Sequence, residues 1–294
     1  MTSIVIAAHN EAAVLGRCLD TLLAEAAPGE FDVTVVANGC TDDTAAVAAA
    51  RPGVRVVDLT TAGKAAALNA GDAVAAGFPR VYLDADIVLT TAAIRALADT
   101  LGGTALAATV GRRLDLTGRP LLVRAYFAVH GRLPVFRDGL FGRGVVALSE
   151  AGRARFGRFP ELVADDLFLD SLFTQAEKRH VTSYAARVAT PRRTGDLVRR
   201  LVRVRGGNAA MRAASANGEV TAPVRSAARL SWLRDVVLPR PWLAPAAVCY
   251  VAVTVVAALA ARRAGDGGAA WGRDESTRQP DAENTADTEP ATRR

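Results

Sequence analysis

Cysteine is scarce in this sequence, which has three cysteines among 294 residues. Cys18, Cys40 and Cys249 lie far apart and form no Cys-x-x-Cys pair. Neither a structural zinc site nor a framework of disulfides is therefore predicted, and a reducing compartment is the default expectation. The opening residues MTSIVIAAHN have no basic n-region, so we predict no signal peptide.

Lysine and aromatic residues are also rare. Of the 36 cationic residues, all but Lys64 and Lys178 are arginine, and the net charge is +6. The arginine excess suits phosphate ligands or an anionic membrane surface, although a GC-rich genome produces the same bias. Aromatic residues make up 5% of the chain, which leaves few platforms on which nucleic-acid bases could stack.

Strand and helix patterns alternate four times in the first hundred residues. Thr41 is expected to cap the second helix, Gly77 to end the third, and Thr90 or Thr91 to cap the fourth. The predicted strands are 3–8, 31–37, 54–59 and 81–89, and the predicted helices are 12–26, 41–51, 64–77 and 91–101. This order predicts an α/β fold with a mostly parallel, Rossmann-like sheet and helices on both faces.

The second half of the chain is less regular. It offers no motif between residues 110 and 160 to which a function can be assigned. The expected elements are a strand within 105–112, a helix at 118–133, a Gly-rich loop with a short strand and a helical segment in 141–157, a helix at 162–179, a strand at 180–190 and a basic helix in 191–212.

An uncharged stretch lies near the C-terminal end. Residues 242–261 contain no charged side chain, and a helix of this length is about 30 Å long, enough to cross a bilayer core. We predict a membrane-type helix here. An in-plane membrane segment and a buried core helix are the alternatives. Residues 265–294 are polar with few aliphatics, so a disordered tail is predicted.

Three polar clusters follow predicted strands. They are His9-Asn10-Glu11, the residues from Asn38 to Asp42, and the Asp84-Ala85-Asp86 stretch inside the apolar run VYLDADIVL. In parallel sheets the carboxyl ends of the strands share one edge, and ligands bind there. Because a buried carboxylate is costly without a cation, Asp84 and Asp86 suggest a divalent metal, Mg²⁺ or Mn²⁺.

Several motifs together resemble inverting family 2 glycosyltransferases, which have the GT-A fold. The resemblance covers roughly residues 3–210, and its motifs occur in family order. They are SIVIAAHNE, VVANGCTDDT, GKAAALNAG, LDAD, the ADD of 164–166 and, more loosely, VRRLVRVRGG. It implies a nucleotide-sugar donor bound by Ala8, Glu11, Asn38, Asp42, Lys64, Asp84 and Asp86, with Asp84 and Asp86 also holding the metal.

The resemblance also implies a catalytic base. Asp166 is the expected base and Asp165 the alternative, and both acids would equally favour a helix N-terminus. Arg199 and Arg203 share a helix face, where they could clamp a diphosphate or an acceptor phosphate, contact anionic lipids, or simply face solvent. The Gln and Trp of the family's basic motif are missing, which argues against processive polymer synthesis.

The sequence therefore predicts sugar transfer to a hydroxyl or phosphate acceptor, lipid-linked or part of a cell-envelope glycan, at the cytoplasmic face of the cell membrane. A nucleotidyltransferase is one alternative, but no glycine-rich loop follows the first strand. A non-enzymatic, arginine-rich protein that binds nucleic acid or membranes is the other, and it leaves the strand-end acids unexplained.

The chain is predicted to divide into four units. They are 1–115, which binds the donor, 116–215, which binds the acceptor, 216–264, which associates with the membrane, and 265–294, the polar tail.

Overall fold

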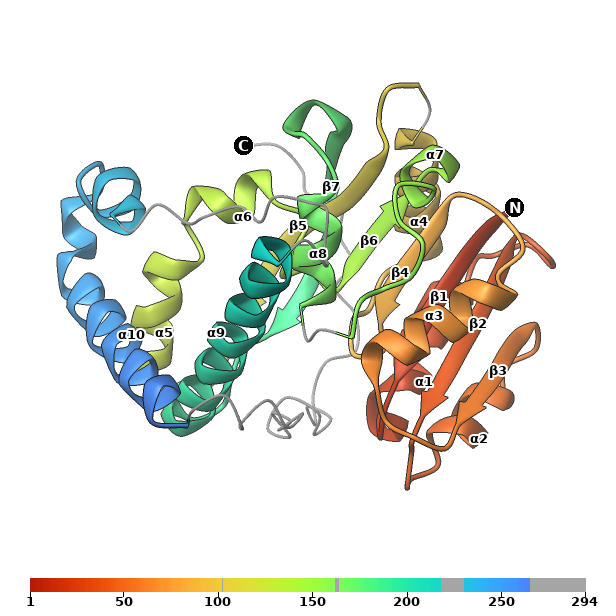
Figure 1. Cartoon of the computed structure of the whole chain (residues 1–294), viewed down its shortest axis with the longest axis horizontal. Helices are drawn as coiled ribbons and strands as arrows, with labels where there is room; N and C mark the ends of the chain where they lie inside the picture. Colours follow the sequence, from red (N-terminus) through yellow and green to blue (C-terminus); the bar gives the residue numbers. More distant parts are fainter. Residues whose placement is uncertain (102, 162–163, 218–229, 265–294) are drawn as a thin grey trace.

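A seven-stranded sheet forms the centre of the molecule. The computed structural model describes residues 1–101, 103–161, 164–217 and 230–264 (Figure 1). The strand order is β3-β2-β1-β4-β6-β5-β7, and only β6 runs antiparallel to its neighbours. The strands are β1 (Thr2–Ala8), β2 (Phe31–Asn38), β3 (Val54–Leu59), β4 (Arg80–Asp84), β5 (Ala107–Asp115), β6 (Val145–Leu148) and β7 (Lys178–Ala189). The predicted mostly parallel sheet is confirmed.

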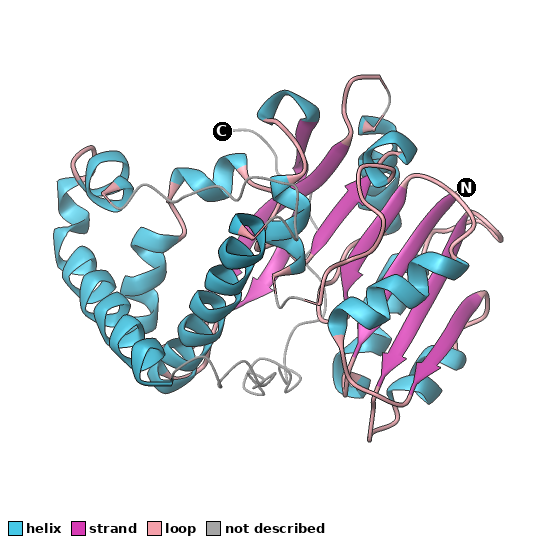
Figure 2. Cartoon of the chain, viewed as in Figure 1, coloured by secondary structure: helices cyan, strands magenta, loops and turns pink. Residues whose placement is uncertain are grey.

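Helices cover both faces of this sheet (Figure 2). The first four are α1 (Ala12–Leu23), α2 (Thr44–Ala49), α3 (Lys64–Val74) and α4 (Thr91–Thr100). The later ones are α5 (Leu121–His130), α6 (Pro134–Asp138), α7 (Glu150–Arg153), α8 (Asp165–Ser171), α9 (Thr194–Ala216) and α10 (Ala244–Ala264). Short turns of other helix types occupy η1 (Gln175–Glu177), η2 (Trp232–Val237) and η3 (Pro241–Leu243).

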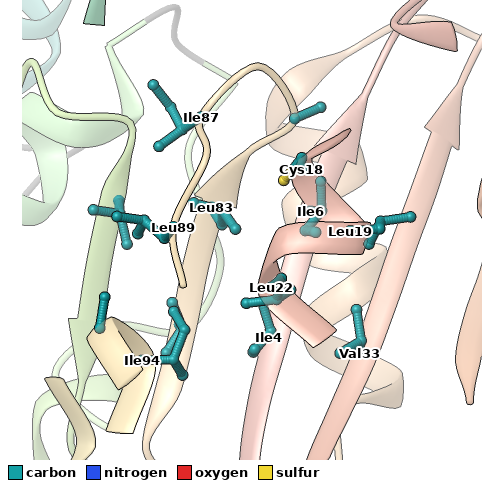
Figure 3. Close-up of a cluster of buried hydrophobic side chains, with 14 of the residues drawn as sticks. Ile4, Ile6, Cys18, Leu19, Leu22, Val33, Leu83, Ile87, Leu89 and Ile94 are labelled. Atoms are coloured by element: carbon teal, nitrogen blue, oxygen red, sulfur yellow. The ribbon is translucent and has the colours of Figure 1, made fainter. Parts of the chain in front are cut away.

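Two hydrophobic clusters sandwich the sheet because successive strand residues point to opposite faces. Ile4 and Ile6 of β1 pack with α1 and α4 on one face (Figure 3). Val5 packs on the other face with residues of α3, α8 and α9. All three β1 side chains are fully buried. This double burial explains why β1 reads as a continuous apolar run, and it fixes the strand ends at which polar residues meet.

Several predicted boundaries are wrong. The strand expected at 81–89 ends at Asp84, and Asp86 lies in the following turn. The helix expected at 162–179 is limited to α8, because Thr174 and Glu177 form a capping box that starts a new turn. Thr41 does not cap α2, which begins at Thr44, whereas Thr90 does cap α4 as predicted.

The third helix also ends earlier than expected. It stops at Val74 rather than at Gly77, because the backbone N–H groups of Ala76 and Gly77 donate to Asp32 and Ser3 of the sheet. The strand expected at 105–112, the helix at 118–133 and the basic helix in 191–212 correspond to β5, α5 and α9. The expected tail at 265–294 lies outside the described residues, and the predicted unit boundaries stay predictions.

The long apolar helix packs against the protein on one side only. α10 contacts α5 and α9, and Tyr250 and Val253 join the hydrophobic cluster between them. Its other side exposes Val248, Val255 and Leu259. Residues Pro241–Arg263 are long and apolar enough to cross a membrane, by length and composition. The helix is therefore partly a packing element and partly an exposed apolar surface.

Candidate active site

Lys64 lies between two carboxylates at the sheet edge. Its Nζ is 2.8 Å from Asp84 Oδ1 at the end of β4 and 3.0 Å from Asp165 Oδ2 at the start of α8. Burial lowers the pKa of Lys64, but Asp165 and Asp84 more than offset this and hold it well above its usual value. The ammonium therefore stays charged at neutral pH and partly neutralises both acids.

Asp166 occupies a different environment from Asp165, its neighbour in sequence. Its two carboxylate oxygens accept hydrogen bonds from the backbone N–H of Gly142, at 2.9 Å, and of Leu167, at 2.8 Å. Burial and the charge of Asp165 raise the pKa of Asp166 to about 6, although the Gly142 bond and Lys64 act in the opposite direction. A carboxylate with this pKa is ionised at pH 7 and basic enough to accept a proton.

The loop of residues 139–144 is hydrogen-bonded to both Asp84 and Asp166. Sequence analysis did not predict this role. Besides the Gly142 bond to Asp166, its Gly144 carbonyl accepts from the Asp84 N–H at 2.8 Å. Gly144 has φ +68°, and a Cβ there would lie 2.4 Å from Ile87 Cγ1 and 3.0 Å from Asp84 Oδ2. Only glycine fits this close approach. The two glycines of the sequence FGRG (141–144) were the only sign in the sequence that the backbone approaches its neighbours closely here.

The predicted donor-binding residues of β1 and β2 lie beside this edge. Asn38, fully buried, accepts a hydrogen bond at Oδ1 from the N–H of Gly63 at 2.8 Å, which ties β2 to the start of α3 and to Lys64. Glu11 is buried just before α1, and its N–H donates to Thr44 Oγ1 at 2.8 Å.

Two further donor-binding candidates belong to the same strand ends. Asp42 accepts from Ala12 N–H at 3.2 Å and from Thr44, so it joins the starts of α1 and α2. The Ala8 carbonyl accepts from Cys40 Sγ at 3.5 Å. The structure thus brings the first two polar clusters together through hydrogen bonds, as the shared sheet edge predicts. Whether these residues hold a nucleotide stays a prediction.

Asp84 and Asp86 supply hard oxygen atoms at the same edge. The Asp84 side chain is partly exposed, and Asp86 is exposed in the turn after β4. Among the described residues, no group of three or more His, Cys, Asp or Glu side chains is arranged to hold a metal ion. Two accessible carboxylates fit a hard cation that takes its other ligands from a bound phosphate and water, as Mg²⁺ commonly does.

Comparison with known proteins decides the family. Residues 3–138 match the family model described as glycosyl transferase family 2. This part of the chain is similar to family 2 glycosyltransferases. The matched residues include Lys64, Asp84 and Asp86, whereas Asp165 and Asp166 follow beyond the matched part. The predicted enzyme class is confirmed, and the match favours it over a nucleotidyltransferase or a non-enzymatic protein. No curated protein matches the chain.

Solved structures agree on the GT-A fold of this glycosyltransferase. A mannosyltransferase from Pyrobaculum calidifontis, in complex with GDP-Man and Mn²⁺, is 22% identical, with a TM-score of 0.57 over 90% of this chain and 79% of that one. Glucosyl-3-phosphoglycerate synthase from Mycobacterium tuberculosis, with Mn²⁺, UDP and glucosyl-3-phosphoglycerate, is 23% identical, with a TM-score of 0.50 over 67% and 74%. At these identities the likeness shows the fold alone.

The two arginines of the predicted clamp, Arg199 and Arg203, both lie on α9. Arg199 pairs with Asp196 on the preceding turn of α9, and its side chain is 76% exposed. Arg203 lies one turn further along the same helix and is partly buried. A phosphate-binding role for the two stays a prediction.

Proposed function

We propose that this glycosyltransferase moves a sugar from a nucleoside-diphosphate-sugar to a hydroxyl or phosphate acceptor, with inversion at the anomeric carbon. The observation that supports it best is Asp166, a buried carboxylate of raised pKa held by Gly142 beside the Lys64–Asp84–Asp165 group. We further propose that the acceptor is lipid-linked or belongs to a cell-envelope glycan.

In the proposed reaction the acceptor oxygen attacks the anomeric carbon from the side opposite the diphosphate. The new glycosidic C–O bond forms while the bond from the anomeric carbon to the diphosphate oxygen breaks, and the nucleoside diphosphate leaves with that electron pair. Asp166 takes the proton of an acceptor hydroxyl, a role typically worth 10²–10⁴-fold in rate. A phosphate acceptor is already an anion, in which case Asp166 mainly orients it.

The donor side uses the acids at the end of β4. Asp84 and Asp86 would hold a divalent cation, Mg²⁺ or Mn²⁺, which when bound stabilises the charge on the leaving diphosphate. The complexes of the two fold relatives with Mn²⁺ and a nucleotide or nucleotide-sugar support this choice. Lys64 places a positive charge beside Asp84. Asn38 holds the backbone of Gly63, the residue before Lys64.

The membrane part of the proposal depends on α10. Its exposed side chains Val248, Val255, Val256 and Leu259 form an apolar surface on the side turned away from α5 and α9. Such a surface suits contact with lipid, and we propose that it keeps the enzyme at the cytoplasmic face of the membrane, where nucleotide-sugars are available. Arg234 and Arg240 precede the segment and Arg262 and Arg263 end it, so cations flank it on both sides.

A donor screen followed by product analysis tests the function. Thermal unfolding is measured with Mn²⁺ and uridine, guanosine or thymidine diphosphate-sugars, and a donor that binds the native state raises Tm in proportion to RT ln(1 + [L]/Kd). The product formed from that donor is then examined by NMR for its anomeric configuration. An inverted product is expected. If none of these donors raises Tm, or if the configuration is retained, the proposal fails.

A further inference from the structure

Four cationic or titratable side chains converge near the site from separate elements. Arg112 comes from β5, His130 from α5, Arg143 from the loop 139–144 and Arg200 from α9. Arg112 lies over the Phe136 ring, with Cζ 3.8 Å from its centroid. We refer to Arg112, Arg143 and Arg200 as the arginine cluster.

In the arginine cluster, the charge of Arg112 is the least well offset by protein groups. Its Nη2 atom is buried and has no hydrogen-bond partner among the described residues. Burial, together with the charges of Arg143 and Arg200, lowers the pKa of Arg112 to about 10. A buried guanidinium is normally retained only when an anion or several acceptors offset its desolvation. Stacking on Phe136 offsets part of that cost, but it leaves the buried Nη2 donor unsatisfied.

The other members have protein partners of their own. Arg143 donates to the carbonyls of Gly139, Phe141 and Phe136 and lies within the electrostatic reach of Asp170. Arg200 donates to the Ala189 carbonyl at 3.2 Å. His130 cannot supply a negative charge, and burial with Arg112 and Arg200 lowers its pKa to about 3, so it stays neutral. The cluster therefore carries an excess of positive charge centred on Arg112.

Gly142 links this charge to the proposed catalytic base. Its N–H donates to Asp166, and a Cβ built on it would lie 3.4 Å from Arg112 Nη1. Gly142 therefore lies close to Arg112 and is hydrogen-bonded to Asp166, so one residue of the loop 139–144 connects the two side chains.

A pocket of about 860 Å³ opens beside Arg112, between β5 and α5. Its lining combines guanidinium groups with apolar side chains. The residues that matter here are Arg112, Arg113, Arg124 and Arg132 with Leu116 and Leu121. Leu121 is 79% exposed at its rim, and the opposite side of α5 packs against α10. Such a lining fits a ligand with an anionic head and an apolar chain.

We propose that this pocket binds the phosphate group of the acceptor, with Arg112 as the residue that contacts the phosphate oxygens and with Arg143 and Arg200 adding positive charge beside it. This inference rests on the proposed glycosyl transfer and names its acceptor class, a phosphate ester. Guanidinium groups bind phosphate oxygens in pairs, and Arg112, which is partly exposed, lines the pocket together with Arg113, Arg124 and Arg132. The apolar walls favour a phosphate attached to an alkyl chain over a soluble phosphate ester.

Ligand titration with two variants tests the proposal. Decyl phosphate, glycerol 3-phosphate and uncharged decyl maltoside are titrated calorimetrically into wild type, Arg112→Met and Arg137→Gln. The first variant keeps the apolar stem of Arg112 and removes its charge. The second changes an exposed arginine of α6, outside the pocket lining, as the matched control. Binding of Mn²⁺ with UDP or GDP is measured on the same samples, because it reports the donor side alone.

Decyl phosphate should bind wild type and Arg137→Gln alike, and Arg112→Met at least tenfold more weakly, with nucleotide binding unchanged. Equal binding of glycerol 3-phosphate would support the phosphate site and identify a soluble source of the ligand. Equal affinity of Arg112→Met for decyl phosphate, or binding of decyl maltoside as tight as that of decyl phosphate, would overturn the proposal. A variant that loses nucleotide binding as well would assign Arg112 a structural role instead. If wild type binds decyl phosphate but no nucleotide, the proposed function fails and the phosphate site stands.

Discussion

The carboxylates at the end of β4 and the arginine cluster beside β5 handle buried charge in opposite ways. At β4, Lys64 lies between Asp84 and Asp165 and neutralises part of their charge within the protein. At β5, Arg112 is surrounded by two further guanidinium groups and retains an unsatisfied donor. Both regions contact the loop 139–144, so the contrast exists within one site.

This contrast indicates which kind of ligand each region would bind. At the end of β4 the lysine offsets the acids within the protein, and the proposed metal and diphosphate would bind there together. In the arginine cluster Asp170 offsets part of the charge of Arg143, whereas the charges that act on Arg112 are both positive, so binding of an anion would lower the cost of burying Arg112. The donor side and the acceptor side should therefore respond differently to substitution.

The largest effect is expected at the acidic edge. Asp86→Ala should abolish detectable transfer and remove metal-dependent nucleotide binding, because it removes one of the two proposed metal ligands. Calorimetry with Mn²⁺ and the nucleoside diphosphate measures this, with Asp99→Ala on the exposed side of α4 as the control. Unchanged nucleotide affinity in Asp86→Ala would remove Asp86 from the metal site and would leave Asp84 as the single β4 ligand.

Substitution of the base should separate binding from turnover. Asp166→Asn is expected to lower kcat by about 10²-fold or more while donor affinity stays near wild type, since the carboxylate acts on the acceptor. Asp165→Asn should have the smaller effect on kcat, because that side chain pairs with Lys64. Steady-state kinetics with both variants decide the assignment, and a reversed order would move the base to Asp165. If neither matters, an already anionic acceptor explains the result.

Membrane binding should weaken without any effect on the donor side. We expect Val248→Gln, Val255→Gln and Leu259→Gln together to lower vesicle binding about tenfold or more, because apolar area is lost from the exposed side of α10. Flotation with phosphatidylethanolamine–phosphatidylglycerol vesicles measures this, and Val74→Gln on α3 is the control. Full binding by the triple variant would show that another surface contacts lipid. Deleting α10 is a poorer test, since it uncovers the cluster on α5 and α9.

The smallest effect concerns stability and its pH dependence. The pKa of Asp166 is about 6 in the fold and about 4 in an unfolded chain, so the folded state holds this proton more tightly. Stability from this group is therefore present at low pH and lost as pH rises from about 4 to 6. Asp166→Asn should raise the unfolding free energy by roughly 2 kcal/mol at pH 7.5 and by little at pH 4. Denaturant unfolding at both pH values checks this, and equal gains would contradict the raised pKa.

The sequence predicted the first half of the molecule better than the second. In β1–β4 the apolar runs and the strand-end polar residues follow from local patterns, and the order of motifs indicated the family. The contacts of Gly142 and Gly144 did not follow, because they depend on β6 pairing antiparallel with β4, more than sixty residues away in sequence. The surroundings of Arg112 could not be predicted either, because an arginine in a strand does not indicate that the side chains near it will also be arginines.

The two lysines make this chain resistant to amine chemistry. Lys178 Nζ lies 2.7 Å from Asp170 and is almost fully buried, and Lys64 is held as a charged ammonium between Asp84 and Asp165. Reagents that acylate amines attack the neutral form, so both side chains should react slowly at neutral pH, whereas Met1 is exposed and carries the N-terminal amine. Attachment of the protein to a surface through amines would therefore favour the N-terminus and leave the Lys64 site untouched.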